Sequence, residues 1–352
     1  MKSKHLFEAI ILPLAALCTL TSCNQDKGYY NLSGFAQGGT WRVTLNVDSN
    51  VTKTPQELKE GIDSILLVID NAVSGYNKSS MLSRFNAGDT VEVNNMFTDI
   101  YKRSYAFWEE TEGAVDVAAG PLFNIWGFGF TKDSLPAPDK VRELIHRCGI
   151  DRLVGEMVLS KGKIHGSMLV KKGETEDLPS LNYNCVAQGY SSDVVADWLR
   201  RNGVTDMLVD VGGEIYVNGF NQSGKGWVLG IDRPEDGNQV AGEKIETIFE
   251  TDGKEYGIVT SGNYRKFYVH DGHKYAHTID PRTGYPVEHH LLSATIISPD
   301  ATSADAYATY CMVIGFEAAR DFINSREDLE GCLIYDDNGT MTTWTSQGII
   351  LR

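Results

Sequence analysis

Residues 191–211, which read SSDVVADWLRRNGVTDMLVDV, mark the point in the chain on which the fold depends. Residues 191–202 predict a helix, and Gly203 follows at the position where a residue in the left-handed conformation commonly ends a helix. Residues 207–211 then begin a series of short runs rich in β-forming residues. The other runs of this series lie at 226–231, 245–249, 258–260, 265–270, 274–279 and 291–298.

The chain on both sides of this region also groups its expected elements in blocks. Leu58, Ile62, Leu66 and Ile69 recur at helical spacing and predict a helix over 55–73. Further helices are expected near 95–110, 139–147 and 303–324, with strands at 40–47 and near 332–345. Because strands and helices do not alternate strictly, we expect an α+β fold with mixed or antiparallel sheets and packed helices. The length allows one large domain or two small ones, and the sequence shows no internal repeat and no linker that divides the chain cleanly.

The composition is that of a globular protein and argues against nucleic-acid binding. The 352 residues are 42% hydrophobic and 22% charged, so the chain can form a core without disulfides or zinc. The net charge is −15, and such a surface repels phosphate backbones. We therefore expect an enzyme or a binding protein whose anionic ligand, if any, arrives with a cation.

The N-terminus is typical of an exported protein. Two lysines precede an apolar run at 9–20, and Leu-Thr-Ser then precedes Cys23, which resembles the bacterial lipobox. An uncleaved membrane anchor is the alternative, but the run is shorter than the ~20 residues needed to span a bilayer. We expect a lipoprotein signal peptide (1–22), a tether lipidated at Cys23 (23–33) and one domain (34–352). The expected location is extracytoplasmic, on the periplasmic face, with a lipid anchor in the membrane.

The cysteines of the expected domain do not form a redox or zinc motif. Cys148, Cys185, Cys311 and Cys332 include no Cys-x-x-Cys pair. Two disulfide bonds are possible among them in an oxidising compartment. Burial as small hydrophobic residues is favoured, because Cys311 and Cys332 lie in apolar runs.

Three histidines lie close together in sequence, but their spacing does not favour a zinc site. An Asp-Gly pair predicts a hairpin in which His270 and His273 face each other across the turn. His277 then lies ~13 Å along its strand from His273, too far to share one metal. His277 also opens the polar turn 277–284, which holds a carboxylate and a guanidinium. This turn suits an anionic ligand or a proton transfer, and an ordinary Asp-Pro turn is the alternative.

Residues 302–309 combine a helix start with oxygen ligands. Thr302 and Asp305 have the spacing of a capping box. Asp305 and Thr309, four residues apart, share one helical face, where two oxygens could help to hold Mg²⁺. The alternative is that Asp305 only interacts favourably with the helix dipole.

Two glycine-containing stretches complete the candidates. Residues 113–121 gather small side chains around Asp116, ahead of the aromatic run 122–128. They would let the backbone approach a flat ring, and tight core packing explains them equally well. Residues 209–215 form a Gly-Gly bend between two β runs, without the Gly-x-Gly-x-x-Gly of a Rossmann fold.

Taken together and in order, these motifs resemble a known family. They are Gly39-Thr40-Trp41, Ser74-Gly75-Tyr76, Ser83-Arg84-Phe85-Asn86, Gly113-Ala114-Val115-Asp116, Gly120-Pro121-Leu122, Trp126-Gly127-Phe128, Ala187-Gln188-Gly189-Tyr190, Val211-Gly212-Gly213-Glu214, Thr260-Ser261-Gly262-Asn263-Tyr264-Arg265, the turn 277–284 and Ala304-Asp305-Ala306. This set is similar to the ApbE family, the bacterial FAD:protein FMN transferases. The resemblance spans nearly the whole chain after residue 33 and implies an ApbE-like, T-fold-like single domain.

The resemblance also implies an activity. Members of the family are Mg²⁺-dependent and extracytoplasmic. They split FAD at its pyrophosphate, join FMN to a threonine of a target flavoprotein through a phosphoester, and release AMP. The targets are typically subunits of membrane electron-transfer complexes. A cation between an acidic protein and a diphosphate is consistent with this chemistry.

Site residues follow from the resemblance position by position. Mg²⁺ is expected on the Asp305 carboxylate, the Thr309 hydroxyl and the main-chain carbonyls of Cys185 and Ala308. His277 is expected to contact FAD and is the candidate base for the acceptor hydroxyl, so His277 and Asp305 are the expected catalytic residues. The expected FAD pocket further includes Gly38, Tyr76, Ala114, Val115, Asp116, Asn182 and Gln188.

The sequence departs from the family pattern at two of these positions. The family usually has Asp where Asn182 stands, and Lys or Glu where Gln188 stands. Both changes remove charge and keep hydrogen-bonding capacity. Two alternatives therefore stand beside the transferase, namely a Mg²⁺-dependent FAD pyrophosphatase that yields FMN and AMP, and a non-enzymatic FAD-binding lipoprotein.

Overall fold

The structure is a computed structural model. It describes residues 28–129, 135–160, 163–171, 179–235, 238, 242–264, 267–270 and 273–349. The expected signal peptide, Cys23 and the Asp-Gly turn at 271–272 lie outside the described residues. Within these ranges, no helix has both the length and the apolar character needed to cross a membrane.

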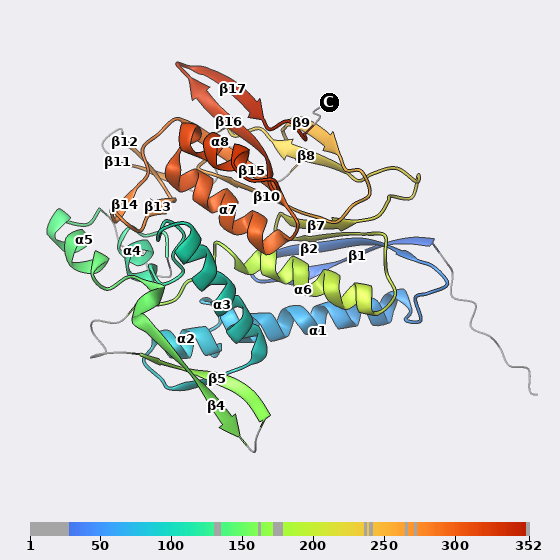
Figure 1. Ribbon diagram of the computed structural model, residues 1–352, viewed down its shortest axis with the longest axis horizontal. Helices are drawn as coiled ribbons and strands as arrows, with labels where there is room; N and C mark the ends of the chain where they lie inside the picture. Colours follow the sequence, from blue (N-terminus) through green and yellow to red (C-terminus); the bar gives the residue numbers. More distant parts are fainter. Residues whose placement is uncertain are drawn as a thin grey trace, which may run out of the picture.

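An eight-stranded sheet forms the centre of the fold (Figure 1). Its strands, in spatial order, are β1 (Gly28–Ala36), β2 (Gly39–Val47), β6 (Met207–Val211), β7 (Glu214–Asn218), β10 (Tyr256–Gly262), β15 (Leu291–Ser298), β16 (Glu330–Asp337) and β17 (Thr340–Thr345). All neighbouring strands in this sheet are antiparallel. The expected α+β fold with antiparallel sheets is therefore confirmed.

Strand β1 corrects the expected boundary of the tether. Residues 28–33, which the sequence analysis assigns to the tether, pair with β2 over the register from Gly28–Val47 to Ser33–Arg42. They form an edge strand, because their backbone groups pair with β2 on one side only. The apolar residues of β2 are buried. The folded domain therefore begins no later than Gly28.

Helices cover one face of this sheet (Figure 1). They are α1 (Pro55–Val73), α6 (Ala187–Arg201), α7 (Ala301–Ile314) and α8 (Phe316–Asn324). The predicted helix at 55–73 is confirmed at both ends, with Thr54 and Glu57 forming a capping box. Helix α6 begins four residues earlier than predicted, and Gly203 follows its end with φ of 92°.

The remaining helices and strands extend the fold beyond the main sheet. These helices are α2 (Met81–Asn86), α3 (Asn95–Glu110), α4 (Gly120–Ile125), α5 (Pro138–Ile145) and the short 3₁₀ helix η1 (Ile150–Arg152). The small sheets pair β3 (Val91–Val93) and β4 (Leu153–Ser160) with β5 (Lys163–Lys171), β8 (Val228–Asp232) with β9 (Ile245–Glu250), β11 (Phe267–His270) with β12 (His273–Ala276), and β13 (Ile279–Asp280) with β14 (Tyr285–Pro286). In the β11–β12 hairpin His270 faces His273, as predicted.

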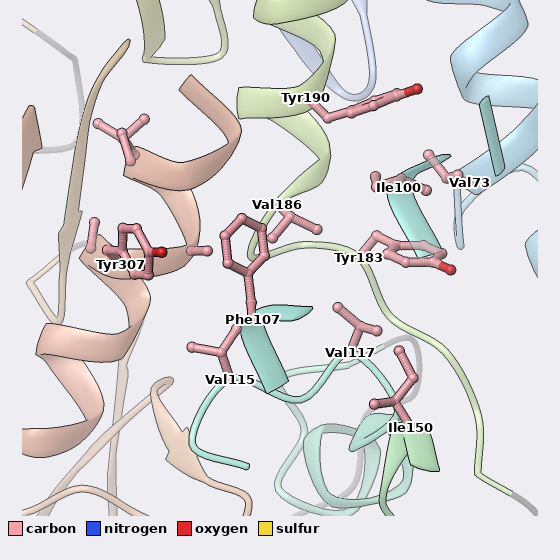
Figure 2. Packing of buried hydrophobic residues seen from close by; sticks show 14 of the residues in the cluster. Val73, Ile100, Phe107, Val115, Val117, Ile150, Tyr183, Val186, Tyr190 and Tyr307 are labelled. Carbon is pink, nitrogen blue, oxygen red and sulfur yellow. The ribbon is translucent and has the colours of Figure 1, made fainter. Parts of the chain in front are cut away.

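The core divides at the sheet because successive strand residues point to opposite faces. In β10, Val259 joins the cluster under the helices, and Ile258 joins the cluster under the β8–β9 hairpin. On the helix side, Phe107 of α3 and Tyr307 of α7 meet edge to face, with ring centroids 5.6 Å apart. Figure 2 shows Phe107 pointing between Tyr307 and Val186. This packing fixes α3 and the segment before α6 against α7.

The start of α7 differs from the prediction. Its N-cap is Asp300, whose carboxylate accepts the N–H of Ser303 at 2.8 Å. Thr302 therefore lies inside the helix, and the predicted capping box of Thr302 with Asp305 is wrong. The reason is that the extended backbone of Asp300 already caps the helix two residues earlier.

The four cysteines of the described chain are all free thiols. Cys311 and Cys332 are fully buried, and Cys148 and Cys185 are partly buried. The expected burial as small hydrophobic side chains is thus confirmed for Cys311 and Cys332.

Candidate functional site

A cavity of about 750 Å³ lies where the end of β10, helix α7 and the α4 region meet. This volume is within the range of small-molecule sites. Its lining includes Ala114, Val115, Asp116, Phe123, Gly127, Phe128, Asn182, Asn184, Cys185, Glu214, Thr260, Ser261, Gly262, Tyr264, Phe267, His277, Thr278, Ile279, Pro281, Asp305, Thr309 and Met312. Segments far apart in sequence therefore form one site.

Helix α7 supplies the acidic wall of the cavity. Asp305, Thr309 and Met312 lie three and four residues apart, so they occupy one helical face. Ala304 and Ala308, beside this face of α7, are completely buried against the core. The predicted pairing of Asp305 and Thr309 on one face is thereby confirmed.

Asp305 is a buried carboxylate without a described cationic partner. Its side chain is only 4% exposed, and its Oδ2 atom accepts the N–H of Gly189 at 3.2 Å. Among the described residues no lysine or arginine forms an ion pair with it. Burial raises the pKa of Asp305, and the nearby Asp193 carboxylate raises it further, against the effect of the Gly189 hydrogen bond.

The loop at 114–118 forms the second wall. The Thr111 hydroxyl accepts the N–H of Val115 at 3.0 Å and fixes the start of the loop. Asp116 turns back on its own segment, where its Oδ1 atom accepts the N–H of Ala118 at 2.8 Å. Burial raises the pKa of Asp116 to about 6, although backbone hydrogen bonds from Ala118, Gly149 and Ile150 act in the opposite direction.

The polar turn that begins at His277 forms the third wall. Its position is fixed by Trp126, whose Nε1–H donates to the carbonyl of Gly284 at 2.8 Å. The ring of His277 lies edge to face with Phe128, with 6.4 Å between centroids. Arg282 pairs with Asp280 within the turn, at 2.9 Å. His277 is thus the residue of this turn that brings an imidazole to the cavity.

The segment before α6 contributes amides and a thiol. The N–H of Asn182 donates to the carbonyl of Val117 at 2.7 Å, and its Oδ1 atom accepts the N–H of Asn184 at 3.0 Å. Cys185 also lines the cavity, and burial raises the pKa of its thiol. Its side chain is therefore a neutral thiol near neutral pH.

The remaining predicted residues lie outside the described lining of the cavity. Gly38 is in the β1–β2 turn, where its φ is 78°. Gln188 lies against Gly212. The contact is so close that a Cβ atom added to Gly212 would fall 1.9 Å from the Gln188 amide nitrogen. Tyr76 follows α1 and is 66% exposed. Ala308 is fully buried, so only its backbone is a candidate ligand.

Several lining residues were not among the predicted site residues. Met312 lies three residues after Thr309, so helical periodicity could have indicated it. Thr260, Ser261 and Gly262 end β10, and polar residues at a strand end are a signal for a site. Glu214 follows the Gly-Gly bend at the start of β7. This motif is part of the family resemblance, but Glu214 is not among the site residues predicted from it.

The donor set fits a magnesium ion better than a transition metal. No group of three or more His, Cys, Asp or Glu side chains in the described ranges could hold a metal. Mg²⁺ instead needs few protein ligands, all oxygens, and retains water or phosphate oxygens. The Asp305 carboxylate supplies one such oxygen, and it lies buried in the cavity wall without a described lysine or arginine partner, so a bound cation would offset its charge. Thr309 adds a hydroxyl on the same face.

Comparison with known proteins agrees with the geometry. A family model described as the ApbE family matches residues 38–333. The chain is 34% identical over 323 residues to a protein of Escherichia coli K12 named FAD:protein FMN transferase, covering 90% of this chain and 86% of that one. A Haemophilus influenzae protein of the same name is 31% identical over 351 residues, covering 97% of each.

A solved structure shows the same fold. The flavin transferase ApbE from Vibrio cholerae superimposes with a TM-score of 0.75 at 30% identity, covering 91% of this chain and 98% of that one. The residues matched by the family model include all those that line the cavity. On the family match and these similarities, the chain belongs to the ApbE family.

Proposed function

We propose that this enzyme transfers FMN from FAD to a threonine hydroxyl of a target flavoprotein, releases AMP and depends on Mg²⁺. The observation that carries the proposal is the buried Asp305 carboxylate in the wall of a cavity of about 750 Å³. A diphosphate and an acidic protein repel each other, so a carboxylate in this position indicates a cation between them. The names of the curated relatives support FAD as the substrate.

The residues present suit this cation. The Asp305 carboxylate, the Thr309 hydroxyl and the main-chain carbonyls of Cys185 and Ala308 would hold Mg²⁺. When bound, the ion would offset the charge of the diphosphate and polarise the phosphorus that is attacked. The aromatic side chains of Phe123, Phe128 and Tyr264 would cover the flat rings of the substrate.

The proposed reaction replaces a phosphoanhydride bond with a phosphoester bond. The threonine Oγ forms a bond to the FMN-side phosphorus of FAD. The bond from that phosphorus to the bridging oxygen breaks, and the bridging oxygen leaves with AMP. His277 would take the hydroxyl proton, because its imidazole reaches the same cavity as Asp305. Buried Asp116 and Asn182 would hold the loop and the segment before α6 that position the substrate.

We further propose an extracytoplasmic location with a lipid on Cys23. This rests on the charged start, the apolar run at 9–20 and the Leu-Thr-Ser-Cys sequence. The target would then be a flavoprotein subunit of a membrane electron-transfer complex on the same side of the membrane. A short tether is consistent with this location, because strand β1 begins at Gly28.

The test is an acceptor assay. Purified protein, FAD and Mg²⁺ are mixed with several candidate acceptor domains, and denaturing gels are read for flavin fluorescence. The proposal predicts a fluorescent acceptor band that disappears with EDTA and with a Thr→Val change in the acceptor. Release of FMN and AMP with no labelled acceptor would identify a pyrophosphatase instead. A stable FAD complex with no turnover at any Mg²⁺ concentration would contradict both enzymatic functions.

A further inference from the structure

Helices α6 and α7 exchange hydrogen bonds at their N-terminal ends. The Asp305 carboxylate of α7 accepts the N–H of Gly189 in the first turn of α6, at 3.2 Å. The Asp193 carboxylate, one turn further along α6, accepts the N–H groups of Ala301 and Thr302 at 2.7 and 2.8 Å. Each helix thus supplies a carboxylate to the N–H groups that the other helix leaves without intrahelical partners.

Asp193 is also held by side chains from two further positions. The Thr302 hydroxyl donates to its Oδ2 atom. The Arg103 guanidinium of α3 lies 3.7 Å from the same atom and also pairs with Asp300, the N-cap of α7. Three helices are therefore joined at one point, about one turn before Asp305.

The contact between the two helices leaves little room for movement. A Cβ on Gly189 would lie 2.3 Å from the carbonyl oxygen of Ala301 and 2.9 Å from the Cβ of Asp305. Backbone therefore meets backbone where α6 crosses the start of α7. A shift of α7 along α6 would change the Asp193 hydrogen bonds and the position of the Asp305 carboxylate together.

We propose that Asp193 is a positioning residue for Asp305, because it fixes the start of α7 against α6 and so sets where the Asp305 carboxylate lies in the cavity wall. This inference rests on the proposed function, in which Asp305 binds Mg²⁺. Asp193 is not among the described residues that line the cavity, so it acts through α7 and not by contact with substrate. Mg²⁺ tolerates little deviation from octahedral geometry, which makes its affinity sensitive to a small displacement.

The experiment compares variants of the purified full chain in detergent. Mg²⁺ alone is titrated by calorimetry, and the Mg²⁺ requirement, kcat and KM for FAD are measured separately. We expect Asp193→Asn to raise the Mg²⁺ dissociation constant about 10- to 100-fold. At saturating Mg²⁺ the KM for FAD should stay within a factor of about two.

Asp300→Asn is the matched control. It removes a carboxylate from the same helix end, but asparagine is also a good N-cap, and the Asp300 carboxylate accepts its described hydrogen bonds from Ser303 and Arg103, not from α6. Its Mg²⁺ dissociation constant should stay within about twofold of wild type. Equal Mg²⁺ constants for wild type and Asp193→Asn, or equal changes in Asp193→Asn and Asp300→Asn, would overturn the inference.

A second variant keeps the test decisive if Asp193→Asn does not fold. Thr302→Val removes one donor to Asp193 and keeps the side-chain shape, so a rise of about threefold in the Mg²⁺ constant is expected. No rise would overturn the inference. Suppose that wild type transfers no FMN, and that Mg²⁺ binding is weaker in Asp193→Asn but not in Asp300→Asn. The proposed function then fails and this inference holds. If wild type transfers FMN and Asp193→Asn binds Mg²⁺ normally, this inference alone fails.

Discussion

Gly189 and Asp305 are joined by a hydrogen bond of 3.2 Å, from the backbone N–H at the start of α6 to the carboxylate in the cavity wall. The bond requires the two helices to approach closely, and glycine permits this approach. A methyl group at position 189 would lie 2.3 Å from the carbonyl oxygen of Ala301. The close packing of α6 on α7 is therefore a condition for the site.

Replacement of Gly189 by alanine tests this condition. The added methyl group must separate α6 from α7, so we expect the free energy of unfolding to fall by about 1–3 kcal/mol and FAD turnover to fall with it. Urea denaturation and FAD turnover measure the two effects. Gly39→Ala is the control, because its nearest described neighbour would be 3.8 Å from the new atom. Unchanged stability and turnover in Gly189→Ala would show that the helices can separate without cost.

Asp305→Asn separates catalysis from folding. The amide has nearly the same shape but no charge, so FAD turnover should fall about 100-fold or more. Because burial raises the pKa of Asp305, the folded apoprotein disfavours the charged carboxylate. The free energy of unfolding in EDTA at pH 8 should therefore stay the same or increase.

The control for this variant is Glu317→Gln, which neutralises an exposed carboxylate on α8. It should change neither turnover nor stability. If Asp305→Asn instead lowers stability and turnover in parallel, Asp305 has a structural role in α7.

Local patterns in the sequence were sufficient for most of the fold. The helix at 55–73 is confirmed because its apolar residues repeat at helical spacing and its N-terminus has a complete capping box. Strand β1 was not predicted, because its half-buried residues at the sheet edge show no strong apolar alternation. The N-cap of α7 is Asp300 and not Thr302 as predicted, because the spacing of Thr302 and Asp305 imitates a capping box inside the helix.

The site required information that lies outside local sequence. Asp305 and Thr309 could be paired by helical spacing alone. Glu214 reaches the cavity only because β7 pairs with β10, whose end forms the cavity wall. The role of Asp193 could not be predicted, because it lies inside an ordinary helix pattern. Its partners at Ala301 and Thr302 are more than 100 residues away. Tertiary contacts of this kind have no local sequence signal.

His277→Gln tests the proposed base. The imidazole lines the cavity, so we expect kcat for FMN transfer to fall about 10²- to 10⁴-fold. The KM for FAD should change by less than about threefold, since the glutamine can still hydrogen-bond in the pocket. Stopped-time assays of the fluorescent acceptor band give both constants. His270→Ala, in the β11–β12 hairpin, is the matched control and should behave as wild type. A large rise in KM with unchanged kcat would assign His277 to binding alone.

Asp116 predicts a specific pH dependence of stability. Its pKa is raised from 3.8 to about 6 by burial, so the folded state binds its proton more tightly than the unfolded state does. The stability that this group contributes is complete below pH ~4 and is lost as the pH rises through about 6. The full loss is on the order of 3 kcal/mol, measured as the free energy of unfolding in urea between pH 4 and 7.

Asp116→Asn should remove this part of the pH dependence, because an amide does not titrate. The curve of unfolding free energy against pH should become flatter between pH 4 and 7, and the variant should be less destabilised at pH 7 than at pH 4 relative to wild type. Asp151→Asn is the control, since Asp151 is exposed and acts on Asp116 only through its charge. It should lower the pKa of folded Asp116 slightly and therefore reduce the size of the transition only a little. Parallel curves for Asp116→Asn and wild type would mean that Asp116 remains ionised in the folded protein throughout this range.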